Sequence, residues 1–253
     1  MKKLIVLCAL LAGDLYGQAS SQTYRFTTDY TILDVRGRVG HRERIVGTYT
    51  RDFSNDKVGW TAVDVSRTST KSPDQFGEPE RREFMEGFSY SLHGGDMTSA
   101  EFFRGLPPGA VQERNLVWDT RMFEAFGEAQ WDSLKPGVPY VFKGQNIPLA
   151  GAGTFENNDV HLVLSGTTTC GIEECGVVDY QAFFNTFELL MPMQTLTGRS
   201  HYWGQIWVSL ATKRVVRASL YEDVLGELKL QGSDEPQTVN IFRVGVLDPV
   251  EER

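Results

Sequence analysis

The feature that most constrains the chain is a hairpin pattern over residues 197–231. Both of its arms alternate side chains with period two, which places successive side chains on opposite faces of a strand. In the second arm Val216, Ala218 and Leu220 share the apolar face. The short segment 211–213 between the arms is typical of a tight turn between antiparallel strands. The pattern therefore predicts a long antiparallel β-hairpin and, with it, a sheet protein.

The same alternation, interrupted by turn residues, recurs through most of the chain. The predicted strands are 23–36, 44–53, 58–67, 82–92, 159–168, 176–190, 196–210, 215–230 and 238–247. Several of them are much longer than an ordinary strand, which is typical of strongly bent sheets and barrels. We therefore predict a mainly β fold, built as a long-stranded curved antiparallel sheet that is half-barrel or barrel-like.

One long amphipathic helix is predicted at about residues 115–134, between the two groups of strands. Its apolar side carries Leu116, Met122, Phe123, Phe126 and Leu134, and its polar side carries Arg121, Glu124, Glu128 and Asp132. A wide apolar stripe of this kind is what a helix needs to lie across a sheet. The expected organisation is a single β-rich domain over residues 20–253, with this helix inserted in it and packed on the sheet.

Residues 1–19 have the pattern of a cleavable signal peptide. Lys2 and Lys3 precede a short apolar run, and Gly17 and Ala19 stand at the positions that a signal peptidase prefers. Asp14 occupies the place where a lipoprotein would have its cysteine. The apolar run is too short to cross a bilayer, and no later run predicts a transmembrane segment. We therefore expect a secreted or periplasmic protein without a lipid anchor.

The charge balance and the missing motifs narrow the function. The net charge of −8 argues against a nucleic-acid partner and against broad adhesion to anionic membranes. The sequence contains no G-x-S-x-G, no H-E-x-x-H and no glycine-rich phosphate loop. The four histidines, His41, His93, His161 and His201, are scattered. We assign no catalytic residue, and we expect no metal and no cofactor.

Two cysteines, Cys170 and Cys175, remain after the signal peptide and flank a short turn. In an oxidising compartment such a pair is expected to form a disulfide. Redox and metal-binding roles are the alternatives, but no second cysteine pair completes a ligand set. We predict a structural disulfide that closes the tip of a hairpin.

Two acids, Asp119 and Glu222, interrupt predicted apolar faces. A buried carboxylate is costly unless it is paired, and its raised pKa makes it a candidate acid or base. The structural alternatives are that Asp119 caps the helix and that Glu222 sits at a bulge or pairs with an arginine such as Arg199 or Arg217. The sequence leaves both interpretations open.

The aromatic residues give the candidate ligand site. Phe183, Phe184 and Phe187 cluster on one predicted strand. The candidate ligand-binding residues are Phe123, Phe126 and Trp131 on the helix, with Trp203 and Trp207 on the face of the hairpin opposite its aliphatic face. These rings either fill a two-layer core or line a cavity under the helix, which would then act as a lid.

The hairpin from Gly204 to Leu230, the signal peptide and the helix between two sheet halves resemble the layout of the LolA/LppX-type extracytoplasmic proteins. That resemblance implies a curved antiparallel sheet that holds a lipid or an acyl chain under a helical lid. It rests on layout, so no site residue is transferred. The leading hypothesis is a non-enzymatic carrier or sensor of an apolar, lipid-like small molecule. The alternatives are an envelope interaction or scaffold protein and a hydrolase with a dispersed acid and histidine site.

Overall fold

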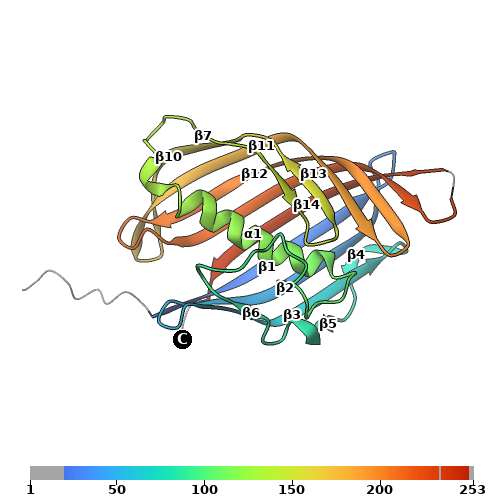
Figure 1. The fold of residues 1–253 in the computed structure, drawn as a ribbon, viewed down its shortest axis with the longest axis horizontal. Coiled ribbons are helices and arrows are strands. Elements are labelled where there is room, and N and C mark those ends of the chain that lie inside the picture. The colour runs from blue at the N-terminus through green and yellow to red at the C-terminus, as the bar shows by residue number, and fades with distance from the viewer. Residues whose placement is uncertain (1–19, 234, 251–253) are drawn as a thin grey trace, which may run out of the picture.

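The computed structural model describes residues 20–233 and 235–250, so the expected signal peptide lies outside the described residues. Antiparallel strands form one sheet of 14 strands, and this sheet does not close into a barrel. Figure 1 shows the sheet curved around α1 (Val111–Gly127), which lies in its hollow. The predicted fold class is confirmed, and of its two forms the structure has the half-barrel.

The strands run in the order β4-β3-β2-β1-β14-β13-β12-β11-β10-β7, and the four remaining strands, β5, β6, β8 and β9, pair at the sides of this path. Their bounds are β1 (Ser21–Leu33), β2 (Val39–Asp52), β3 (Lys57–Ser69), β4 (Ser72–Phe76), β5 (Glu80–Arg81), β6 (Ser89–Tyr90), β7 (Tyr140–Phe142), β8 (Gln145–Pro148), β9 (Gly153–Asn157), β10 (Val160–Cys170), β11 (Glu173–Met191), β12 (Gln194–Ser209), β13 (Val215–Leu230) and β14 (Gln237–Pro249).

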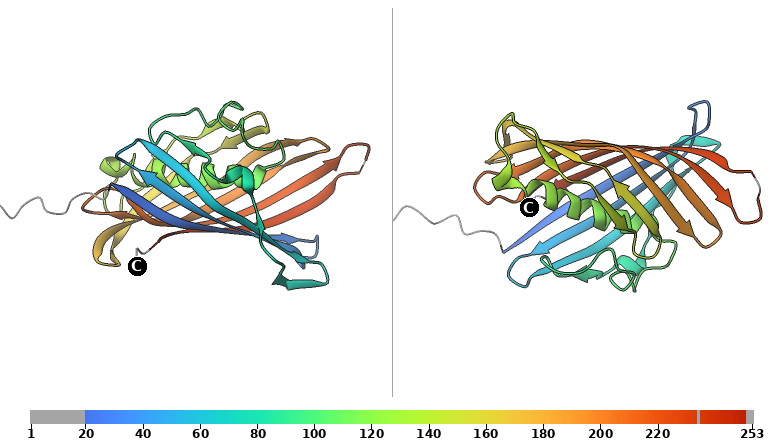
Figure 2. Two further views of the ribbon diagram at one scale, coloured as in Figure 1. Left: turned by 90° about the horizontal axis from the view of Figure 1, so that it is seen from below. Right: turned by 45° about the horizontal axis from the view of Figure 1, so that its top comes forward.

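The first and last strands lie side by side near the middle of the sheet. In this pair Phe26 faces Leu247 and Leu33 faces Asn240. The pairing joins an N-terminal half, β1 to β4, to a C-terminal half that begins with β7 (Figure 2). Because α1 comes from the segment between the two halves, it is positioned to cover the seam that joins them.

Eight of the nine predicted strands are present, and the strand predicted at residues 82–92 is wrong. That segment contains only a 3-10 turn at Glu83–Met85 and the two-residue β6, and the short β5 ends just before it. Met85 donates its backbone N–H to Arg82, and Phe88 donates to Met85. Gly87 has a φ of +78°, which few residues other than glycine adopt readily. The segment therefore forms a local turn, although its side chains alternate as in a strand.

The inserted helix also differs from the prediction at both ends. It begins at Val111, directly after a loop containing two prolines, and ends at Gly127 instead of continuing to residue 134. An added Cβ at Gly127 would lie 2.8 Å from Ile206, so the backbone of α1 approaches β12 closely at this point. A 3-10 turn at Trp131–Ser133 follows. The sequence pattern extended the predicted helix to residue 134 because Leu134 is apolar, and Leu134 is buried just after this turn.

The apolar side of α1 packs on the sheet as the sequence predicts. Phe123 is completely buried, and its ring lies 6.1 Å from Phe26 and 6.4 Å from Tyr180. These contacts join the helix to β1 and to β11, which belong to different halves of the sheet. One side chain of the helix therefore stabilises both halves.

The polar side of α1 was expected to face solvent, opposite the apolar stripe, but its acidic residues Glu124 and Glu128 pair with the sheet. Arg51 on β2 binds Glu128 through two hydrogen bonds of 2.5 and 2.8 Å. Its Nε lies 3.4 Å from Glu124, and the Arg51 side chain is only 6 % exposed. Glu128 also accepts the backbone N–H of Val215 at 2.7 Å. Removing one partner of such a buried ion pair leaves an uncompensated charge, so these pairs hold the helix in place.

Candidate functional site

The five residues predicted to bind an apolar ligand do not form one site. Phe123 and Phe126 are buried in the core, whereas Trp203 and Trp207 lie on the opposite, outer face of β12. Trp131 packs near Gly176 at one end of β11, with the Lys213 ammonium 4.9 Å from its ring centre. The structure therefore separates this set into three places.

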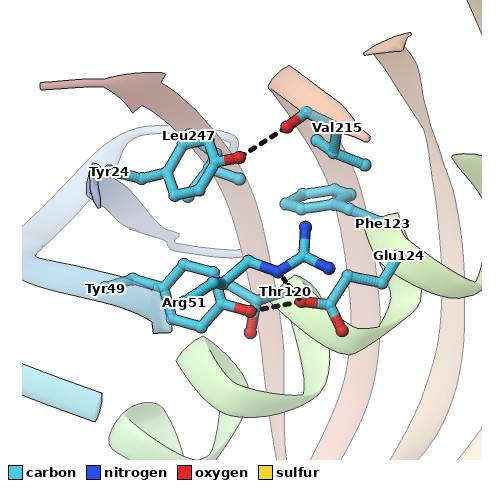
Figure 3. Close-up of a pocket in the computed structure, with 8 residues that line it drawn as sticks. All are labelled: Tyr24, Tyr49, Arg51, Thr120, Phe123, Glu124, Val215 and Leu247. Atoms are coloured by element: carbon cyan, nitrogen blue, oxygen red, sulfur yellow. Dashed lines mark hydrogen bonds and ion pairs between the residues drawn. The ribbon is translucent and has the colours of Figure 1, made fainter. Parts of the chain in front are cut away.

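The space between α1 and the sheet is filled at the place where the sequence allowed either a core or a cavity. Figure 3 shows Tyr24, Tyr49, Arg51 and Phe123 meeting beneath the helix. The gap that they line leaves no room for a water-sized sphere. The Tyr24 hydroxyl donates to the carbonyl of Val215 at 2.5 Å, and the Tyr49 hydroxyl donates to Glu124. Of the two interpretations of the rings, the packed two-layer core is the one found at this place.

The two suspected acids come together around one buried arginine. Arg243 on β14 bonds both oxygens of Asp119, at 3.0 and 3.1 Å, and lies 2.7 Å from Glu222. Glu222 also accepts a 2.6 Å hydrogen bond from Ser200. Asp119 lies inside the helix instead of capping it, so that alternative was wrong. Glu222 does pair with an arginine, but the partner is Arg243 and not Arg199 or Arg217.

Asp119 and Glu222 share the single positive charge of Arg243, and this sharing affects the pKa of Asp119. Burial, opposed by Arg243 and reinforced by the Glu222 carboxylate, raises the pKa of Asp119 to about 6. Asp119, Glu222 and Arg243 connect α1, β13 and β14, and Asp119 and Arg243 are buried. The cluster is therefore a structural link between helix and sheet whose strength depends on pH.

The expected disulfide is not present, since Cys170 and Cys175 are both free cysteines. In the β10–β11 register Cys170 faces Glu173 and Cys175 faces Thr168, so the two cysteines are diagonal neighbours. Diagonal Cβ atoms lie farther apart than the ~3.8 Å typical of a disulfide. Burial, followed by a hydrogen bond with the Cys170 thiol, raises the pKa of Cys175.

The most unusual surface feature is a β-bulge at Phe183 and Phe184 in β11. The register with β12 passes from Ala182 opposite Tyr202 to Asn185 opposite Ser200, so both phenylalanines face His201 alone. Phe184 has a φ of +61° and its side chain is 65 % exposed. A bulky residue in this left-handed conformation is strained, and such strain persists only when the surroundings impose it.

Four hydrogen bonds impose the conformation of the bulge. The Asn158 side-chain amide donates to the carbonyls of Phe183 and Phe184, at 3.0 and 2.8 Å. The Asn158 backbone N–H donates to the side chain of the buried Asn185 at 2.9 Å. The Phe184 N–H donates to Nδ1 of His201 at 3.1 Å, and the His201 ring lies 5.1 Å from the Phe184 ring. The two phenylalanine rings are therefore held outside the core by a specific scaffold.

The bulge borders a surface groove of about 610 Å³. The groove is lined by Gly144, Asn157, Asn158, Asp159, His161, Phe183 and Phe184. These residues come from the end of β9, from β10 and β11, and from the connections before β8 and β10. The volume lies within the range of small-molecule sites, and the lining combines exposed rings with a few polar groups.

Sequence reasoning named these phenylalanines only as part of an aromatic cluster. A signal was available, because two adjacent phenylalanines break the period-two pattern of β11, and such a break indicates a bulge. The contributions of Gly144, Asn158 and Asp159 had no comparable signal, since they depend on which loops meet at β11.

No protein-family model matches the chain, and no curated protein matches it. Within residues 20–233 and 235–250, no helix has both the length and the apolar character needed to cross a membrane. The same residues contain no group of three or more histidine, cysteine or acidic side chains arranged to hold a metal ion.

Proposed function

We propose that the chain is an extracytoplasmic, non-enzymatic binding protein, a carrier or sensor, that binds the apolar part of a lipid-like ligand in the groove beside the bulge. The observation that carries the proposal is the exposed Phe184 ring on a left-handed backbone. Asn158 donates a hydrogen bond to the Phe184 carbonyl, and the Phe184 N–H donates one to His201. Strain of this kind is concentrated at functional sites.

The proposed ligand site differs from the one expected from the sequence, which lay under the helix. The interior gap under α1 is filled, so the proposed site is on the surface and the helix is not its lid. Export through the signal peptide and a kinship with the LolA/LppX-type proteins are parts of the proposal. The open curved sheet is compatible with that layout but is not specific to it.

The proposal is tested with dodecyl maltoside, a neutral amphiphile, used below its micelle concentration. Calorimetry on the intact protein should detect binding that Phe184→Asn abolishes, because asparagine tolerates the left-handed backbone but provides no ring. Ile172→Asn is the matched control, since Ile172 is a fully exposed apolar residue in the distant β10–β11 turn. Equal loss of binding in both variants, or no binding by the wild type, would contradict the proposal.

An envelope interaction protein is the second candidate, and one observation favours it. The Trp203 and Tyr221 rings stack on the outer face, 6.0 Å apart and 18° from parallel, and Tyr221 is 37 % exposed. Exposed aromatic residues are enriched at protein interfaces. Cross-linking in the native envelope, with Tyr221→Ser as the comparison, would detect a protein partner of this face.

A further inference from the structure

We propose that the ligand of the groove carries a quaternary ammonium group, which binds between the phenylalanine rings and the carboxylate of Asp159. This inference rests on the proposed function and narrows it to amphiphiles with a trimethylammonium head. Three features of the groove support it: the charge of its lining, the exposure of its rings and the weakness of the existing ion pair between Lys143 and Asp159.

The lining of the groove is acidic. Asp159 is the one acidic side chain among the seven lining residues, and none of the seven is lysine or arginine. Its carboxyl is ionised at neutral pH, because hydrogen bonds from the Lys143 side chain and the Gly144 backbone lower its pKa. An anionic head group would meet this carboxylate in a protein whose net charge is already −8. The charge of the groove therefore complements a cation.

The rings favour a weakly hydrated cation. Phe183 is 41 % exposed and Phe184 is 65 % exposed, so both present ring surface to a ligand. An aromatic face attracts a cation electrostatically, and the recognition of quaternary ammonium groups is the best-known use of this attraction. A trimethylammonium group also offers methyl surface to the rings. A primary ammonium is a more strongly hydrated point charge and gains less from such a site.

The cation already beside Asp159 is easily displaced. Lys143 lies 2.8 Å from the carboxylate, but its side chain is 79 % exposed. Exposed pairs of this kind contribute little to stability, so a ligand that contacts both the carboxylate and the rings can replace Lys143. The backbone N–H of Gly144 would continue to hold the other carboxylate oxygen, at 3.0 Å.

The test uses three amphiphiles that share one alkyl chain and differ only in the head group: dodecyltrimethylammonium, dodecyl maltoside and dodecyl sulfate. Calorimetry below the micelle concentrations should give at least about fivefold tighter binding of the trimethylammonium compound than of the maltoside. Dodecyl sulfate should bind most weakly. The preference should decrease as salt rises from about 20 mM to about 500 mM, because added ions screen an exposed charge.

Asp159→Asn is the decisive variant. Asparagine keeps an oxygen for the Gly144 N–H but removes the charge, so the fold is retained. The variant should bind dodecyl maltoside as the wild type does and should lose the preference for trimethylammonium. Equal affinities for the two head groups in the wild type, tighter binding of the sulfate, or an unchanged preference in the variant would each overturn this inference while leaving the proposed function intact. If the wild type binds none of the three, the proposed function itself fails.

Discussion

Replacing Phe184 by asparagine should leave the protein as stable as the wild type or make it more stable, although it removes a large apolar side chain. The left-handed conformation costs an ordinary residue about 1–2 kcal/mol, and asparagine is one of the few residues that adopts it readily. The Phe184 ring is 65 % exposed, so only about a third of the ~1.5–3 kcal/mol available from full burial is lost. The expected change in the free energy of unfolding is a gain of between about 0 and 1 kcal/mol.

Phe183→Asn is the matched control for this prediction. Phe183 is the preceding residue, its ring is 41 % exposed, and it is not among the described residues with positive φ. Its replacement loses more buried surface and relieves no strain, so it should destabilise the protein by about 1–2 kcal/mol.

Urea unfolding of the two variants separates the loss of buried surface from the relief of backbone strain. In thermal melts the Tm of Phe184→Asn should lie several degrees above that of Phe183→Asn. About 2–4 °C per kcal/mol is expected for a chain of this length. A Phe184→Asn protein that is destabilised as much as Phe183→Asn would refute the argument from strain.

Three further predictions concern α1. Because the pKa of Asp119 is raised to about 6, the folded state holds its proton more tightly than the unfolded chain. The wild type should therefore lose about 3 kcal/mol relative to Asp119→Asn as pH rises from about 4 to above about 6, and matched urea titrations across pH measure the difference. Phe123→Asp should destabilise by several kcal/mol in the same assay, since it puts a charge in place of a fully buried ring. Glu128→Ala should cost about 3 kcal/mol by leaving Arg51 without its closest partner, whereas Ala at the exposed Asp132 should stay within about 0.5 kcal/mol. Equal changes in the free energy of unfolding at Glu128 and Asp132 would contradict this and would indicate that the acidic side of the helix is solvated.

The sequence was sufficient to predict most of the strands, their inward and outward faces, and the side of α1 that packs on the sheet. The physical reason is that these properties are local. Alternation with period two assigns each residue of β12 and β13 to a face whatever the neighbouring strand is. The helical spacing of Phe123 and Phe126 defines an apolar stripe before any partner is known.

Only the tertiary structure decided which segments meet. Nothing in the pattern indicates that β1 pairs with β14, or that Arg243 on that last strand is the partner of Asp119 in the middle of the chain. Faces follow from spacing along the chain, but partners depend on contacts between residues far apart in sequence. The same limit applies to the groove, where Asn158 reaches the carbonyl of Phe184 because two loops converge on one bulge. The sequence determined the elements, and long-range packing determined the filled interior, the shared arginine and the surface site.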